Sequence, residues 1–248
     1  MGALDGKVAI VAGGGTGIGR AISLRFAREG ARVAVFGRRP DPLREVAAAV
    51  TAAGGQAFAE PGDVGVESDV ARLVAETTRR WGGIDVLVNC AAVRLNAPLE
   101  QVAAADFAEV LRINLVGAFV LTKAVAASMR ARGGGSIVHI GSALGAVAVR
   151  DFSPYVASKG GLNALARAAA VELVGDRIRV NVVSPGTIDT VISAGVTEFR
   201  RRMLEHRIPI GRPGHVDDIA AACLYLASDA AGYVTGSVLA VDGGWTAA

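Results

Sequence analysis

The sequence predicts an α/β fold, a doubly wound and mostly parallel sheet of seven strands with helices on both faces. Short Val/Ile-rich runs alternate with longer Ala/Leu/Arg segments of helical period along the whole chain. Hydrophobic residues make up 52% of the 248 residues and charged residues 20%, which is enough apolar surface for a sizeable core. An aromatic share of 5% beside 32 glycines suits aliphatic strands buried on both faces and joined by tight turns. Because no repeat or linker divides the chain, we expect a single domain over residues 1–248.

Seven apolar runs have the length and β-branched composition of strands: Val8–Ala12, Arg32–Phe36, Ala57–Glu60, Val86–Asn89, Ser136–Ile140, Arg179–Val183 and Val238–Val241. Six longer segments with apolar residues at helical spacing are expected helices: Gly17–Gly30, Pro42–Ala53, Ser68–Trp81, Ala103–Arg132, Pro154–Gly175 and Val216–Ser228. Two of these begin at a proline, with Asp41 and Ser153 as the expected N-caps. Each helix crosses back over the sheet, and such crossovers are right-handed almost without exception, so the strands become parallel neighbours.

One stretch departs from this alternation. Residues 186–214 contain no expected strand and one short expected helix near Thr197–His206. Connections of this length inside a compact domain are often lids or binding loops. This one follows the carboxyl end of a strand, where open α/β sheets bind ligands. We therefore expect a substrate lid at about residues 186–214, and its apolar members indicate an apolar pocket: Val191, Ile192, Phe199, Met203 and Leu204.

The charge pattern does not indicate a nucleic-acid partner. The net charge is +3, but basic residues are spread among acidic ones and no stacked aromatics accompany them. The densest cluster, Arg200-Arg201-Arg202, is expected to be a solvated helix face. The three histidines show no ligand spacing with Cys or carboxylates, so no metal site is proposed, and His139 is expected in or beside the core.

The remaining composition favours a cytoplasmic protein. Cys90 and Cys223 lie far apart in apparently buried segments, so a disulfide framework is not expected. The apolar runs read as short and interrupted by glycine or charge, so no membrane span is expected. The N-terminus lacks the basic and then apolar pattern of a secretory signal.

A glycine-rich turn follows the first strand and opens the first helix. It reads Gly13-Gly14-Gly15-Thr16-Gly17-Ile18-Gly19. Glycines allow a tight turn and close approach of the backbone to a pyrophosphate, while the helix N-terminus supplies N–H donors and positive potential. This strand–turn–helix context favours a dinucleotide site over a merely structural turn.

Glycines 13, 17 and 19 have the spacing G-x-x-x-G-x-G, and with the alternating elements this resembles the short-chain dehydrogenase/reductase superfamily over nearly the whole chain. The single-domain branch that includes the 3-oxoacyl-[acyl-carrier-protein] reductases is similar. Ala12 replaces the threonine usual before the first glycine, which removes a hydroxyl expected to brace the turn. The resemblance implies cofactor contacts from the loop: Gly13, Gly15, Thr16, Gly17, Ile18 and Gly19.

The end of the second strand bears on which cofactor is used. Gly37 occupies the position where NAD-preferring members carry an acid, and Arg38 and Arg39 follow it. An arginine fork binds a phosphate with charge-assisted hydrogen bonds, so NADP(H) is favoured and NAD(H) is the alternative. Arg38 is the stronger candidate, because Arg39 precedes a proline and is expected to point away. Both arginines could instead be turn residues that lead into the next helix.

The resemblance implies further cofactor contacts at the ends of later strands. Asp63 and Val64 match the family's adenine-contacting pair, with a turn or cap role for Asp63 as the alternative. Asn89-Cys90-Ala91-Ala92 stands where the family has Asn-Asn-Ala-Gly, so Asn89 and Ala91 are carried over, and Cys90 is interpreted as a small buried hydrophobe. The segment after the sixth strand contributes the residues expected beside the nicotinamide: Pro185, Gly186, Ile188 and Thr190. Thr190 could instead cap a helix.

Tyr155 and Lys159 are four residues apart and share one face of an expected helix. A cation near a helix N-terminus is disfavoured by the helix dipole, so the charge of Lys159 is expected to have a function. With Ser142 and Asn114, the pair matches the family's catalytic tetrad. Lys159 and the helix N-terminus are expected to lower the pKa of Tyr155 toward that of a general acid/base. Ser142 would bind the substrate oxygen, and Asn114 would hold Lys159 through water.

The resemblance implies hydride transfer between nicotinamide and a ketone or secondary alcohol. An acyl carrier protein is a candidate partner, with Arg130, Arg132 and Arg177 as a basic rim for it or as solvated helix ends. The family is commonly tetrameric, so a homotetramer is expected. The alternatives are an NAD-dependent alcohol dehydrogenase of the same family and a non-catalytic protein that senses dinucleotides.

Overall fold

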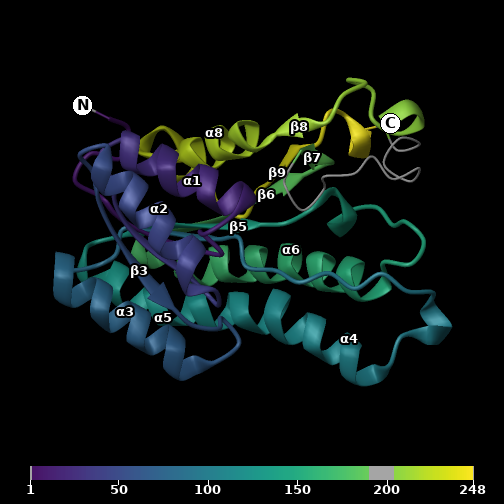
Figure 1. Cartoon of the computed structure of the whole chain (residues 1–248), viewed down its shortest axis with the longest axis horizontal. Helices are drawn as coiled ribbons and strands as arrows, with labels where there is room; N and C mark the ends of the chain where they lie inside the picture. Colours follow the sequence, from purple (N-terminus) through teal and green to yellow (C-terminus); the bar gives the residue numbers. More distant parts are fainter. Residues whose placement is uncertain (1, 190–203, 248) are drawn as a thin grey trace.

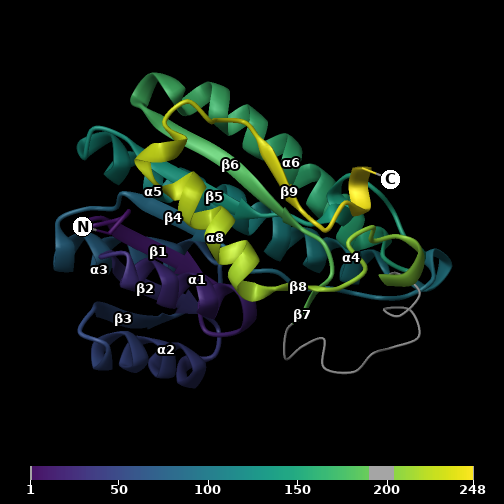
Figure 2. The same ribbon diagram turned by 90° about the horizontal axis from the view of Figure 1, so that it is seen from above.

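The main sheet has seven parallel strands in the order β3-β2-β1-β4-β5-β6-β9, in a computed structural model that describes residues 2–189 and 204–247 (Figures 1 and 2). Its strands are β1 (Val8–Ala12), β2 (Arg32–Gly37), β3 (Gln56–Pro61), β4 (Val86–Asn89), β5 (Gly135–Ile140), β6 (Ile178–Pro185) and β9 (Val238–Val241). The order reverses at β1, which confirms the doubly wound topology. Ala12 lies opposite both Phe36 and Asn89, so three strands end at one edge.

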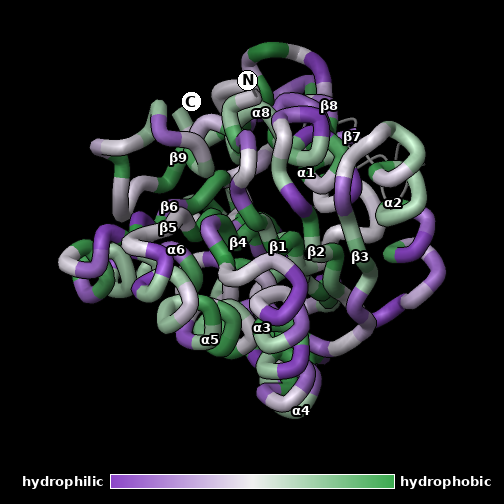
Figure 3. Tube along the Cα trace, turned by 90° about the vertical axis from the view of Figure 1, so that its left-hand side faces the viewer, coloured by the Kyte–Doolittle hydropathy of each residue, from purple (hydrophilic) through white to green (hydrophobic). Residues whose placement is uncertain are grey.

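Helices cover both faces of the sheet. One layer holds α1 (Gly17–Arg28), α2 (Pro40–Ala52) and α8 (Val216–Ala227), and the other holds α3 (Glu67–Trp81), α4 (Ala104–Leu111), α5 (Gly117–Ala131) and α6 (Ser153–Leu173) (Figure 1). Neighbouring strand residues feed opposite layers: Val11 belongs to the first core and Ile10 to the second. The hydrophobic strands therefore run through the interior, and polar positions gather on the outer helices (Figure 3). The predicted strand and helix bounds hold to within two residues.

The helix expected over Ala103–Arg132 contains a break in its regular hydrogen bonding. A π-helical segment, Arg112–Val116, joins α4 to α5. Such segments are rare and frequently lie at functional sites, and this one carries Asn114. The combined helix Ala104–Ala131 is also long and apolar enough, by length and composition alone, to cross a membrane. The expectation that every apolar run is short is therefore wrong here, although more than half of the apolar window is buried inside the protein, as in a core helix.

Helix α6 begins one residue earlier than expected. Phe152 is the N-cap and makes no side-chain cap bond, while Ser153 and Pro154 are already helical. The predicted N-cap role of Ser153 is therefore wrong, and its buried hydroxyl has no hydrogen-bond partner among the described residues. The start of α2 differs in the same way, because Arg39 and not Asp41 is the N-cap before Pro40. Proline fixes the first-turn backbone in both helices, so neither start needs a capping side chain.

The ends of the expected lid are paired with each other. Strand β7 (Ile188–Asp189) runs parallel to β8 (Gly214–His215), and the amide of Gly214 donates to the carbonyl of Thr187 at 2.9 Å. The expectation of no strand between residues 186 and 214 is therefore wrong at both ends. Residues 190–203, which include most of the expected short helix, lie outside the described residues.

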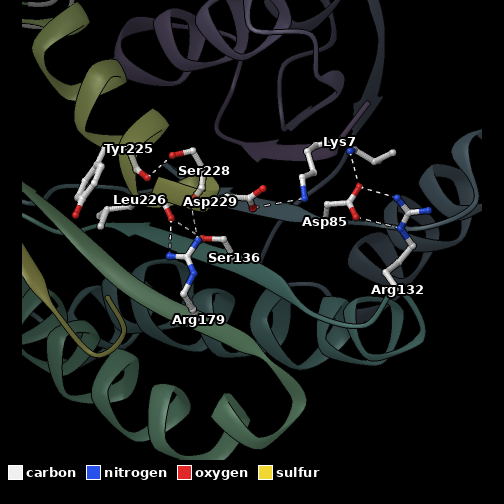
Figure 4. Close-up of polar contacts among 10 residues, drawn as sticks. Lys7, Asp85, Arg132, Ser136, Arg179, Tyr225, Leu226, Ser228 and Asp229 are labelled. Carbon is white, nitrogen blue, oxygen red and sulfur yellow. Dashed lines mark hydrogen bonds and ion pairs between the residues drawn. The ribbon is translucent and has the colours of Figure 1, made fainter. Parts of the chain in front are cut away.

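The edge where the strands begin is held by charged side chains (Figure 4). Arg132 contacts both carboxylate oxygens of Asp85 at 3.0 Å, and Asp85 also accepts from the amide of Val8 at 2.8 Å. On the same edge, Arg179 donates to the carbonyls of Leu226 at 2.8 Å and Ser228 at 3.1 Å. These carbonyls lie at the C-terminal end of α8, where the helix has no internal donors for them. The side chains of Asp85, Arg132 and Arg179 therefore link the starts of β1, β4 and β6 to the C-terminal ends of α5 and α8.

The predicted basic rim for an acyl carrier protein lies on this edge. Arg132 and Arg177 each stand just before the start of a strand, β5 and β6, so both lie opposite the carboxyl ends of the sheet. Arg130 is paired with Asp176, and Arg132 with Asp85. This placement and pairing favour the alternative in which these arginines are solvated helix ends, while the docking role stays a prediction.

Candidate active site

A cleft of about 1510 Å³ lies along the carboxyl edge of the sheet. Residues that follow or close every strand of the main sheet line it: Gly13, Arg38, Asp63, Cys90, Ser142, Gly186 and Trp245. Open α/β sheets bind ligands at this edge, beside the strand where the order reverses. The cleft brings together the described members of the predicted set, with Gly13, Gly15, Thr16, Gly17, Ile18, Gly19, Arg38, Arg39, Asp63, Val64, Ala91, Ser142, Tyr155, Lys159, Pro185, Gly186 and Ile188 in its lining. Asn89 and Asn114 stand directly behind this lining, and Thr190 lies outside the described residues.

The glycine loop has no room for side chains at its turn. Gly13 has a φ of +73°, and a Cβ on it would meet the backbone of Cys90 and Ala91 at 2.8 Å. A Cβ on Gly19 would lie 2.1 Å from the carbonyl oxygen of Gly13. The N-cap Thr16 makes no side-chain cap bond, and the first turn of α1 holds no acid. The first-turn N–H groups therefore face the cleft as donors suited to a pyrophosphate.

Two arginines extend the cleft beyond the glycine loop. Arg38 and Arg39 are exposed and line it at the end of β2. The guanidinium of Arg39 donates to the hydroxyl of Thr16 at 3.4 Å. The expectation that Arg39 points away is therefore wrong, because the N-cap position that precedes Pro40 directs its side chain back to the loop. Both cations lie where a 2′-phosphate of an adenosine ribose could be bound.

Asp63 is held by its neighbours where the cleft passes the end of β3. Its Oδ1 accepts from the amide of Gly65 at 2.8 Å, and its Oδ2 lies 3.3 Å from Arg112. The Nε of Arg112 also lies 2.7 Å from the carboxylate of Glu109, and Glu109 and Asp63 together raise the pKa of the guanidinium. Asp63 therefore also has the turn role that the sequence left open, and Val64 beside it is buried.

Cys90, in the segment after β4, is partly exposed and lines the cleft. Asn89 is buried and its Oδ1 accepts from the amide of Ala91 at 3.1 Å. The amide of Cys90 donates to the carbonyl of Ala12 at 2.8 Å, which ties β4 to β1. Burial raises the pKa of Cys90 to about 12, against a smaller lowering by Lys159. Cys90 is therefore a protonated thiol, in agreement with its interpretation as a small hydrophobe.

Lys159 is a buried cation beneath Tyr155. Its side chain is 2% exposed, its Nζ donates to the carbonyl of Ile140 at 2.7 Å, and the ammonium lies 5.6 Å from the centre of the Tyr155 ring. Burial lowers the pKa of Lys159 to about 8. The helical spacing of four residues thus places both groups on one face, as expected.

The pKa of Tyr155 moves in the direction opposite to the prediction. Burial raises it above 10, while a hydrogen bond with Ser142 and the positive charge of Arg94 lower it by less. Desolvation of the phenolate at this position outweighs the charge of Lys159, which the sequence shows, because the amount of burial depends on the assembled cleft. The predicted partner Ser142 lies near enough to Tyr155 to lower the pKa of the phenol, and its Oγ accepts from the amide of Leu144 at 3.1 Å.

Asn114 holds the loop after β4 against helix α6. Its Oδ1 accepts from the amide of Val93 at 2.8 Å, its Nδ2 donates to the carbonyl of Val93 at 2.9 Å, and Nδ2 also donates to Ser158 at 3.0 Å. Ser158 donates in turn to the carbonyl of Tyr155 at 2.8 Å. The side chain of Asn114 is thus committed to the frame around Tyr155, which leaves its backbone for the predicted link to Lys159.

The far wall of the cleft comes from the end of β6. A Cβ on Gly186 would meet the backbone of Asp242 at 2.7 Å, so the chain passes this point without a side chain. Ile188 is 9% exposed and begins β7. Asp242 accepts from the amides of Gly244 and Thr246, at 3.0 and 2.9 Å. This network fixes the C-terminal turn that carries Trp245 into the cleft.

An apolar group of residues beside Tyr155 lines the cleft and was not predicted from the sequence. Leu144, Phe152 and Trp245 are buried members of a small apolar core that Tyr155 joins, and all four line the cleft. Arg94 stands above them with its guanidinium 5.6 Å from the centre of the Phe152 ring. The position of Arg94, directly after the segment at the end of β4, was a usable signal. No sequence signal pointed to Trp245, because its position in the cleft depends on the turn around Asp242.

Comparisons with known proteins agree with this geometry. A family model described as enoyl-(acyl carrier protein) reductase matches residues 12–246. The chain is 40% identical over 242 residues to cis-4-hydroxycyclohexanecarboxylate dehydrogenase of Sinomonas cyclohexanicum, covering 97% of each chain. It is 35% identical over 241 residues to a 3-oxoacyl-[acyl-carrier-protein] reductase of Thermotoga maritima, covering 97% of this chain and 98% of that one.

A solved structure extends the likeness to three dimensions. The structure of a 7α-hydroxysteroid dehydrogenase complexed with NADH and 7-oxo glycochenodeoxycholic acid superposes with a TM-score of 0.93 at 35% identity, covering 98% of this chain and 95% of that one. The relatives and the solved structure agree on an oxidoreductase that acts between alcohols and ketones, and the family model is likewise that of a reductase. The chain belongs to the short-chain dehydrogenase/reductase family.

Proposed function

We propose that this protein is an NADP(H)-dependent oxidoreductase that transfers a hydride between nicotinamide and a ketone or secondary alcohol, with Tyr155 as general acid/base. The observation that carries the proposal is the meeting of two sites in one cleft. The Ser142–Tyr155 pair with Lys159 beneath it opens into the same cleft as the glycine loop. A reacting carbon can then lie between the proton donor and the nicotinamide.

The described residues fit a dinucleotide. The loop from Gly13 to Gly19 and the first turn of α1 would hold the pyrophosphate, and Arg38 with Arg39 would hold a 2′-phosphate. Ile188 and Thr190 remain proposed contacts at the nicotinamide end. Bound there, the dinucleotide supplies the hydride for reduction or accepts it in oxidation. NAD(H) is the alternative cofactor, and the similar steroid dehydrogenase was solved with NADH.

The chain's own residues handle the proton and the oxygen. In reduction, the Tyr155 hydroxyl protonates the carbonyl oxygen, and the hydroxyl of Ser142 donates to the same oxygen as negative charge develops on it. In oxidation, Tyr155 takes the proton from the alcohol. A neutral tyrosine is the form that donates, so the raised pKa of Tyr155 keeps it ready for reduction at neutral pH.

Lys159 and Asn114 support this proton transfer. The ammonium of Lys159 stabilises the phenolate that remains after Tyr155 has given up its proton. Asn114 positions the helix through Ser158 and the loop through Val93. Both are therefore proposed to set the alignment of Tyr155, while Ser142 and Tyr155 contact the substrate.

The substrate proposed here is a ketone with an apolar, ring-sized body. The cis-4-hydroxycyclohexanecarboxylate dehydrogenase and the steroid dehydrogenase both act on alcohols of ring systems by their names. The apolar lining formed by Leu144, Phe152 and Trp245 supports such a body. The 3-oxoacyl-[acyl-carrier-protein] reductase relative keeps acyl carrier protein as a candidate partner, with docking at the mouth of the cleft.

The proposed setting is a cytoplasmic homotetramer of single-domain subunits. Apolar side chains exposed on neighbouring helices support assembly through α5 and α6: Val116, Phe119, Val171 and Val174.

The test is reduction of a panel of cyclic, acyl-thioester and small aliphatic ketones with NADPH and with NADH, including 4-oxocyclohexanecarboxylate. We expect turnover with NADPH, and a loss of kcat of about 10²–10⁴-fold in Tyr155→Phe. Tyr233→Phe is the matched control, since Tyr233 is fully exposed and is not among the residues that line the cleft. NADPH binding without turnover in wild type, or equal turnover in wild type and Tyr155→Phe, would contradict the proposal.

A further inference from the structure

Arg94 places an unpaired cation at the substrate end of the cleft. It is exposed, lines the cleft, and lies near enough to Tyr155 for its charge to act on that hydroxyl. Within residues 2–189 and 204–247 it forms no ion pair, whereas Arg112, Arg130 and Arg132 each contact an acid. A guanidinium carries five N–H donors and no acceptor, so this one keeps its donors available to a ligand.

The backbone on both sides of Arg94 is fixed. Val93 is held through its N–H and its carbonyl by Asn114, at 2.8 and 2.9 Å. Three residues after Arg94, the amide of Ala97 donates to the carbonyl of Asp151 at 3.0 Å. The loop is therefore bound at two points to the elements that carry the proposed catalytic groups. Such anchoring reduces the entropy lost when the side chain binds a ligand.

The Phe152 ring fixes the direction of the side chain. The guanidinium carbon lies 5.6 Å from the ring centre, which is a cation–π contact. An aromatic ring accepts no conventional hydrogen bond, so this contact leaves the N–H donors of the guanidinium to other partners. Phe152 is the N-cap of α6, three residues before Tyr155. The position of the cation is thus coupled to that of the proposed proton donor.

The other charged groups at this end do not neutralise Arg94. Arg150 and Asp151 are exposed and line the cleft, and neither has an ion pair within the described ranges. The floor below is apolar, formed by Leu144, Phe152 and Trp245. The substrate end thus offers an apolar surface beside two cations and one acid, which suits an apolar body that ends in one negative charge.

We propose that Arg94 is a specificity-determining residue that binds a carboxylate on the substrate, remote from the carbonyl that Tyr155 protonates. The inference rests on the proposed reductase function and names its substrate class, a ketone or alcohol with an apolar body and one carboxylate. A guanidinium and a carboxylate form two parallel charge-assisted hydrogen bonds, so Arg94 would fix the orientation of the substrate as well as its affinity.

The kinetic test compares two ketones that differ in one charge, 4-oxocyclohexanecarboxylate and its methyl ester. In wild type we expect the acid to have the higher kcat/KM. In Arg94→Met, we expect a loss of about 10–100-fold for the acid, mainly through KM, and little change for the ester. Arg94→Lys should recover part of the loss. Equal effects on acid and ester, or no preference for the acid in wild type, would overturn the assignment.

Two control variants and a binding measurement complete the test. Arg150→Met removes the neighbouring cation, and Arg28→Met removes a charge from the end of α1, away from the cleft. A carboxylate effect that follows Arg150 and not Arg94 would contradict the assignment.

Calorimetry with cyclohexanecarboxylate in the presence of NADP⁺ needs no turnover. Binding to wild type that is lost in Arg94→Met supports the inference even if no ketone is reduced, whereas binding retained in Arg94→Met overturns it. Absence of turnover with every ketone counts against the proposed function alone.

Discussion

The Nζ of Lys159 lies 2.7 Å from the carbonyl oxygen of Ile140, so the last residue of β5 binds a cation that helix α6 buries. This contact explains how a lysine is kept near the N-terminal end of a helix, where the dipole opposes it. The carbonyl compensates for part of the lost hydration, and burial lowers the pKa of the ammonium to about 8. Keeping Lys159 protonated in this buried position at neutral pH therefore lowers the stability of the folded protein.

That cost predicts a pH dependence of folding. An unfolded lysine has a pKa near 10.5, so between pH 8 and 10.5 the unfolded chain binds more protons at this site than the folded chain. Stability contributed by Lys159 should then rise with pH across this window, by about 3 kcal/mol in total. Urea unfolding at pH 7 and pH 10 measures it. The difference between wild type and Lys159→Met should change with pH, and Lys123→Met, an exposed lysine, should show no such change.

The clamp made by Asn114 should affect both stability and catalysis. Asn114→Ala leaves the amide and carbonyl of Val93 without their partners, which should lower the free energy of unfolding by about 1–3 kcal/mol. Because Val93 precedes Arg94 and Ser158 contacts Tyr155, we also expect a lower kcat. Ser158→Ala removes one contact of the same network and should cost less. Thermal unfolding and steady-state kinetics check this order, which a larger effect in Ser158→Ala would contradict.

The glycine loop should reject a single methyl group. In Gly19→Ala the new Cβ would meet the carbonyl oxygen of Gly13 at 2.1 Å, so the loop must move and dinucleotide affinity should fall at least tenfold, on the scale of the loss of one charge-assisted contact. Gly175→Ala is the control, because nothing lies within 4 Å of its Cβ. Fluorescence titration with NADPH measures both. Equal affinity in wild type and Gly19→Ala would contradict the geometry of the loop.

The two cysteines should be unreactive in the folded protein. Burial raises the pKa of Cys90 to about 12 and that of Cys223 well above its ordinary value, so neither forms a thiolate near neutral pH. We expect no rapid reaction with a thiol reagent at pH 8, and reaction of two thiols after denaturation. Cys90→Ala should keep its activity. A fast-reacting thiol in the native protein would contradict the raised pKa of Cys90, which lines the cleft and is partly exposed.

Much of the fold follows from local pattern. Val8–Ala12, Val86–Asn89 and Val238–Val241 were predicted to the residue, because each is an apolar run with sharp ends, and the first two are buried throughout. The π-helical segment around Asn114 could not be predicted, since one extra residue in a helical turn leaves no trace in an apolar period. Nor could the pairing of β7 with β8, which joins two-residue strands far apart in the chain.

The residues that form the site could be predicted from the sequence better than the directions of their pKa shifts. Tyr155, Lys159 and Ser142 meet as their spacing and strand order indicate. The direction of the Tyr155 pKa was missed, because burial is a property of the assembled cleft and outweighs the charges counted along the chain. Arg39 was predicted as a candidate, but its direction was wrong for a similar reason. Its direction depends on the N-cap geometry before Pro40, which brings it to Thr16.

The most direct test of the central claim is a titration of wild type, Arg38→Ala and Arg39→Ala with NADPH and with NADH, followed by nicotinamide fluorescence. The structure leads us to expect tighter binding of NADPH in wild type, with about a tenfold or greater loss in Arg38→Ala that spares NADH. Arg39→Ala should lose less, because its guanidinium is shared with Thr16. Tighter binding of NADH would redirect the search to NAD-dependent alcohol oxidation, and binding of neither dinucleotide would contradict the account.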